Sequence, residues 1–115
     1  MNGAILKISE DKTLELRFTA RRAEKLEALL GESLLDGLQK TDRIGVTAQF
    51  IACGADIPKN EALDVYDEFV ENGGTINDAA NVIFEALVNG GFISKPAADA
   101  AKKVQDQLSR ATQQS

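Results

Sequence analysis

The apolar pattern changes its period once, after Phe18, and this change constrains the fold more than any other feature of the sequence. Residues 14–18 alternate apolar and charged side chains, which is the two-residue period of a half-buried β-strand. Residues 4–8 show a similar pattern, and the polar residues 9–13 suit a short turn. Because an isolated hairpin is marginal in water, we expect its apolar face to pack on helices or to pair with another chain.

From Thr19 onward the apolar residues recur at spacings of three and four, as in amphipathic helices. Glycines and N-capping residues divide this part of the chain into five or six helices. The first predicted helix starts at Ala20, is capped by Thr19 and ends at Gly31, and a short second one begins at Ser33. The third is capped by Thr41 or Asp42 and ends at Gly54, and the fourth covers residues 60–72. The fifth is capped by Thr75 and Asp78 and ends at Gly90, and the last is capped by Ser94.

These patterns predict one mainly α domain over residues 1–115. A β-hairpin occupies residues 3–18, helices occupy residues 20–110, and residues 111–115 form a frayed tail. The length is typical of a single domain, and no repeat or linker divides the chain.

The composition excludes several kinds of chemistry. The chain has no histidine, which is the commonest general base and transition-metal ligand, and Cys53 is its single cysteine. Ser9 and Lys12 match a Ser-x-x-Lys spacing, but the companion motifs are missing and a solvated turn explains them. Phosphate-loop and EF-hand spacings are also missing. We therefore expect no enzymatic activity, no cofactor and no metal, and we interpret Cys53 as a small core residue.

Negative charge is concentrated in one block. The formal net charge is −5, yet residues 60–94 hold seven acids and no Lys or Arg, and the rest of the chain is slightly basic. This balance argues against nucleic acid and anionic membranes as partners. Neither a signal peptide nor an apolar run near the roughly 20 residues of a membrane span occurs, so we expect a cytoplasmic protein.

Within this block, four acids fall at spacings of three and four and so share one helix surface, which we call the acidic stripe. Two interpretations remain open: a docking surface for a basic partner or a divalent cation, and a solvated face opposite the apolar side of the helix. The acidic stripe consists of Asp64, Asp67, Glu68 and Glu71.

Arg21 and Arg22 form a small basic cluster at the start of the first predicted helix, where positive charge is mildly unfavourable. Glu24 and Glu27 are interleaved with it, so a nucleic-acid patch is not expected. A head-to-tail contact with the acidic block of a second copy would account for the cluster, and we predict possible homo-oligomers on this basis.

The predicted helix over residues 44–55 is apolar on two sides, so it is either central in the fold or shares a face with a partner. Phe18, Val46 and Phe50 are therefore candidate partner contacts. Core packing of the same three residues is the alternative.

Several short motifs resemble a known family. Residues 26–35 read Leu-Glu-x-Leu-Leu-Gly-x-Ser-Leu-Leu after a strand, and later come Asp67-Glu68-Phe69, the Gly73-Gly74 break and the helix over residues 81–87. This order resembles the tail assembly chaperones of long-tailed (siphovirus-type) bacteriophages. The resemblance covers about residues 14–92.

The resemblance implies a binding role. Proteins of this family bind the tail tube protein and the tape measure protein, prevent premature assembly, and are absent from the finished virion. It thus implies these two partners and the host cytoplasm as the location. The alternative is a small acidic regulator that mimics nucleic acid and sequesters a DNA-binding protein, but a mimic should spread its carboxylates widely rather than in one block.

Overall fold

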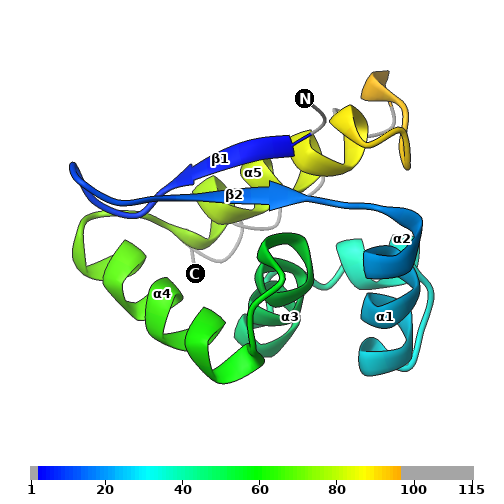
Figure 1. Ribbon diagram of the computed structural model, residues 1–115, viewed down its shortest axis with the longest axis horizontal. Coiled ribbons are helices and arrows are strands. Elements are labelled where there is room, and N and C mark those ends of the chain that lie inside the picture. The colour runs from blue at the N-terminus through cyan, green and yellow to red at the C-terminus, as the bar shows by residue number, and fades with distance from the viewer. Residues whose placement is uncertain (1–2, 97–115) are drawn as a thin grey trace, which may run out of the picture.

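A β-hairpin and five helices make up the part of the chain that the computed structural model describes, residues 3–96 (Figure 1). The fold class is therefore mainly α with an N-terminal hairpin, as predicted. The elements are β1 (Gly3–Lys7), β2 (Thr13–Arg17), α1 (Ala20–Leu30), α2 (Leu34–Leu38), α3 (Ile44–Ala55), α4 (Lys59–Glu71) and α5 (Ile76–Asn89).

The hairpin covers the helices with its apolar face. Its two strands are antiparallel, with Ala4 opposite Leu16 and Leu6 opposite Leu14. Leu6 and Leu16 are fully buried against α5 and α3, over which the hairpin lies in Figure 1. The expectation that this face packs on helices is confirmed.

Helix α3 is the centre of the core, and its residues 47–54 are all buried. Helix α3 has the predicted range 44–55, but the residue that stops it is Asp56, in a left-handed conformation with φ 59°, and not Gly54. Gly54 instead allows close packing, since a Cβ there would lie 3.0 Å from the Phe18 ring.

The predicted N-cap of α3 is also wrong. The N-cap position is Arg43, which makes no side-chain capping bond. Thr41 is buried and braces the turn before α3: its Oγ1 donates to the Leu38 carbonyl at 3.1 Å, and its own carbonyl accepts from Thr47 Oγ1 at 2.6 Å. A threonine hydroxyl that can cap a helix can equally bond a preceding carbonyl, so the local pattern alone does not decide between the two.

Helices α4 and α5 are joined by a tight turn. A Cβ on Gly74 would lie 2.4 Å from the Phe69 ring, and Gly73 has a φ of 96°, so both positions require glycine. Thr75 and Asp78 then form the predicted capping box of α5, each side chain accepting from the other's backbone N–H. The predicted helix after Ser94 and the frayed tail lie essentially outside the described residues.

Candidate functional site

Phe18 and Phe50 lie in the core. Both rings are buried and meet edge to face, with their centroids 6.4 Å apart. Val46 is half-buried and packs against the same core. Since Phe18 and Phe50 present no surface in this fold, core packing rather than partner contact explains them.

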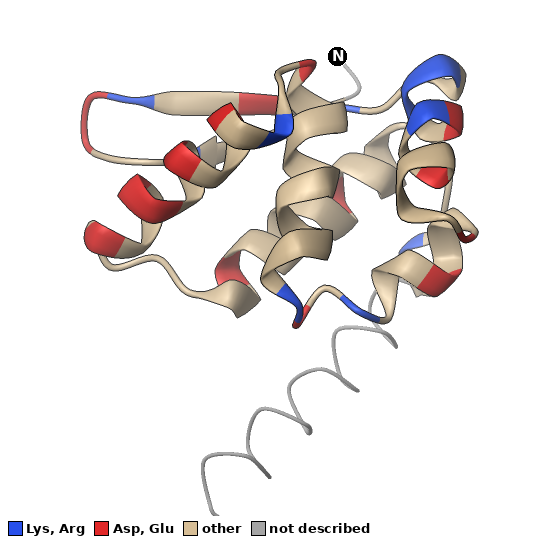
Figure 2. Ribbon diagram, turned by 90° about the horizontal axis from the view of Figure 1, so that it is seen from below, with Lys and Arg blue, Asp and Glu red and all other residues tan. Residues whose placement is uncertain are grey.

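The acidic stripe lies on the outer side of α4. Figure 2 shows the red acidic residues along this helix. The opposite side of α4 packs on the core through Ala62, Val65, Tyr66 and Phe69. The helical spacing of the four acids therefore places them on one surface, as predicted from the sequence.

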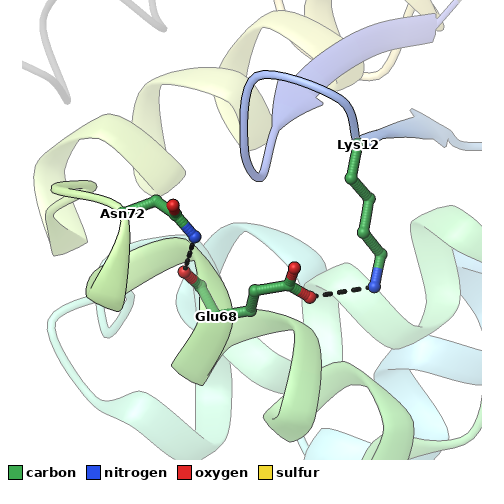
Figure 3. Close-up of polar contacts among 3 residues, drawn as sticks. All are labelled: Lys12, Glu68 and Asn72. Carbon is green, nitrogen blue, oxygen red and sulfur yellow. Dashed lines mark hydrogen bonds and ion pairs between the residues drawn. The ribbon is translucent and has the colours of Figure 1, made fainter.

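Glu68 differs from the other three acids because it is paired. Lys12, in the hairpin turn, donates from Nζ to Glu68 Oε1 at 2.9 Å (Figure 3). Asn72 Nδ2 donates to the backbone carbonyl of Glu68 at 2.7 Å, which closes the end of α4. Glu68 thus ties the hairpin turn to α4, although an ion pair this exposed contributes only about 0.2–1 kcal/mol.

The other three acids have no base to pair with among residues 3–96. Asp64, Asp67 and Glu71 are exposed, and like charges three or four positions apart on a helix each cost about 0.2–0.5 kcal/mol. Glu71 also stands in the last turn of α4, which holds no basic residue, and there a negative charge opposes the helix dipole. These carboxylates do not stabilise the fold.

Beside the acidic stripe lies a groove of about 710 Å³, which we call the α4 groove. Ile44 and Val70, about half exposed at 53% and 46%, are its most accessible apolar residues, and Asp67 and Glu71 are its charged ones. Three helices and the α4–α5 turn contribute to it. Its lining is Ile44, Leu63, Tyr66, Asp67, Val70, Glu71, Gly74, Thr75 and Ile76.

The sequence pattern does not predict this groove. The periodicity assigns Ile44 to an apolar stripe of α3 and Val70 to the apolar face of α4, which suggests burial for both. Val70 is at the margin of that face and Ile44 is the first residue of its helix, and such positions are the ones that packing leaves open. Only the arrangement of α3, α4 and α5 brings the two together.

Arg22 has a structural role that its sequence context does not predict. Its Nη1 donates to the carbonyls of Arg17 at 2.9 Å and Gly54 at 3.0 Å, so it joins the end of β2 to the C-terminal end of α3. A cation is favourable at that helix end. Arg21 is exposed, and its part in self-association stays a prediction.

Metal-ligating side chains and the single cysteine were the remaining candidates for chemistry in the described part of the chain. Within residues 3–96, no three His, Cys, Asp or Glu side chains are placed to hold a metal ion. Burial raises the pKa of the Cys53 thiol above its ordinary value, and Gln49 Nε2 lies 3.9 Å from its Sγ. Cys53 is a buried core residue, as interpreted from the sequence.

The motif over residues 26–35 folds into the turn between α1 and α2, which we call the α1–α2 corner. Gly31 ends α1 with a φ of 72°, and Ser33 Oγ accepts from the backbone N–H of Asp36 at 3.1 Å. Glu27 Oε2 accepts from the backbone N–H of Leu34 at 2.7 Å. Each of these contacts satisfies a backbone group that a helix end leaves unpaired.

Comparisons with protein families, curated proteins and solved structures found no match to this chain. Of the helices in the described part of the chain, none has the length and apolar character to cross a membrane. The surface of α4 and the motifs of the sequence are therefore the observations that bear on function.

Proposed function

We propose that this chain is a phage tail assembly chaperone that binds the tail tube protein, the tape measure protein or both, and prevents their premature assembly. The observation that carries the proposal is the α4 groove, in which half-exposed apolar residues lie beside carboxylates that have no base to pair with among the described residues. The motif over residues 26–35 supplies the choice of family.

The energetics of the groove favour a binding surface. Ile44 and Val70 leave apolar area in water, and the carboxylates of Asp67 and Glu71 repel each other across one helical turn. Both costs fall when a partner covers the apolar area and brings positive charge. Exposed apolar area that is rimmed by polar groups commonly marks protein interaction sites.

The proposed mechanism is reversible masking. The α4 groove covers an apolar and basic assembly surface on the partner, so that two partner copies cannot meet through it. Exposed ion pairs are weak and the exposed apolar area of the α4 groove is small, so we expect an affinity low enough for the partner to be released. Polymerisation of the tube then competes for the same surface, and the chaperone stays in the host cytoplasm, absent from the finished virion.

The test is a polymerisation assay with the tail tube protein encoded by the same genome. We expect the chain to co-purify with that protein or with the tape measure protein, and to lengthen the lag of tube formation, followed by light scattering. Sedimented tubes should contain none of the chain.

Two results would contradict the proposal: an unchanged lag at a molar excess of the chain, and failure to co-purify with either protein. Bovine serum albumin at the same concentration controls for non-specific crowding in the scattering assay.

A further inference from the structure

We infer that the α4 groove binds an amphipathic helix with Lys or Arg beside its apolar stripe. This inference rests on the proposed function in one respect, since the helix would belong to a tail protein. It adds the chemistry of the bound segment, which the proposed function leaves open.

The residues that line the groove suit a bound helix. On α4 its lining residues are Leu63, Tyr66, Asp67, Val70 and Glu71, which follow a helical spacing over two turns, or about 12 Å of axis. Ile44 of α3 and Ile76 of α5 add the remaining large apolar side chains. A second helix would pack with its axis about 8–10 Å from the axis of α4 and with its side chains between those of α4.

An extended segment fits this surface less well. A strand must pair its backbone N–H and C=O groups, and a helix side offers it no backbone ladder. A helix satisfies its backbone internally and can place apolar residues at i, i+3, i+4 and i+7 onto Ile44 and Val70.

The charge of the groove determines which charged side chains the bound helix can carry beside its apolar stripe. Its two charged lining residues, Asp67 and Glu71, are both acidic, and Asp64 lies further along the same outer side of α4. No Lys or Arg occurs from residue 60 to residue 94. Lys and Arg can lay their aliphatic stems along apolar surface and bring their charge to the rim, whereas Asp or Glu would be repelled.

The test titrates the full chain with a fluorescent peptide of about four helical turns, made of Leu and Lys with leucines at i, i+3, i+4 and i+7. One comparison peptide has the same composition in scrambled order, and a second has Glu in place of Lys. Fluorescence anisotropy at low and high ionic strength gives the affinity. We expect the Leu/Lys helix to bind tightest and to weaken with salt.

Groove variants then locate the binding. The double variant Ile44→Gln/Val70→Gln should weaken binding about 10-fold or more, because half-exposed apolar area is lost from the contact. Asp67→Asn/Glu71→Gln should weaken it about fivefold and remove most of the salt dependence. The matched controls, Leu35→Gln at a 57% exposed leucine and Glu24→Gln at an exposed acid of α1, should change affinity less than twofold.

Three results would overturn the inference. They are equal binding by the groove variants and the wild type, equal or tighter binding of the Glu peptide, and a dimer in sedimentation that Ile44→Gln/Val70→Gln dissociates. The last result would make a second copy the occupant of the groove.

Failure of the inference and failure of the proposed function are distinguishable. If the groove variants still bind the tail proteins and delay tube formation, the chaperone proposal stands and the groove assignment fails. If the peptide binds through the groove while neither tail protein does, the groove assignment stands and the chaperone proposal fails.

Discussion

The α1–α2 corner and the outer side of α4 use their polar residues in opposite ways. At the corner, Glu27 and Ser33 each bond the backbone at the start of α2, and Gly31 ends α1. On α4, Asp67 and Glu71 have no base to pair with within residues 3–96, although they stand beside exposed apolar area. Contacts within the α1–α2 corner account for its polar residues, whereas no ion pair among the described residues accounts for Asp67 and Glu71.

The motif that resembles the chaperone family and the proposed docking surface therefore lie in different regions of the molecule. The motif over residues 26–35 consists largely of residues that build a helix–turn–helix corner. The groove that we propose as the docking surface lies on other helices. Substitutions in the two regions should therefore have different consequences for stability.

The largest effect is expected from Leu26→Ala, which removes a fully buried side chain of α1. The cavity and the lost burial should lower the free energy of unfolding by about 2–5 kcal/mol. Urea denaturation followed by circular dichroism measures it. Leu29→Ala, at a 54% exposed leucine on the same helix, is the matched control and should change stability by about 0.5 kcal/mol or less. Equal effects at the two positions would contradict the packing of α1.

Loss of the Glu27 contact should have a smaller effect. In Glu27→Gln the backbone N–H of Leu34 loses its bond to a carboxylate, and we expect a destabilisation of about 1 kcal/mol. Chemical denaturation of Glu24→Gln, an exposed acid one turn earlier, gives the control. Should both variants be equally stable, the contact at 2.7 Å contributes nothing.

On α4 we expect a substitution to raise the free energy of unfolding rather than lower it. Glu71→Gln removes a negative charge from the end of the helix and from its repulsion with Asp67, so we expect stabilisation by about 0.3–1 kcal/mol at low ionic strength. The gain should decrease with added salt, and thermal unfolding at two salt concentrations measures it. Destabilisation would mean that Glu71 has a structural role after all.

The smallest effect concerns the ion pair in Figure 3. Lys12→Gln should destabilise the chain by a few tenths of a kcal/mol, because the side chains of Lys12 and Glu68 are 51% and 40% exposed. A double-mutant cycle with Glu68→Gln isolates the pair. A coupling energy well above 1 kcal/mol would show that Glu68 belongs with the structural residues rather than with the acidic stripe.

Local signals predicted the fold well where the chain supplies both halves of a contact. Thr75 and Asp78 are three residues apart and cap α5 by themselves, and the alternating residues of β2 meet those of β1 across one turn. Prediction failed where a distant element decides. Gly54 lies inside α3, where the ring of Phe18 packs on it. The prediction for Thr41 failed for a local reason, because its hydroxyl bonds the Leu38 carbonyl three residues earlier instead of capping α3.

The candidate site was predicted only in part, because spacing along one helix can be read from the sequence and the packing of three helices cannot. The acidic stripe follows from the spacing of four residues on one helix, so the sequence alone places it. The α4 groove depends on how α3, α4 and α5 lie together, and neither Ile44 nor Val70 departs from a normal apolar pattern. Phe18 and Phe50 could not be separated from surface residues until the hairpin was placed on α3.

The most direct test of the docking surface is a chemical-shift map of the isotope-labelled full chain during titration with soluble tail tube protein. We predict that the largest shifts fall on Ile44 and on the backbone amides from Leu63 to Ile76. The Leu/Lys peptide should reproduce the same pattern. Shifts confined to the α1–α2 corner would contradict the assignment of the α4 groove. No shifts with either tail protein at saturation would contradict the chaperone proposal.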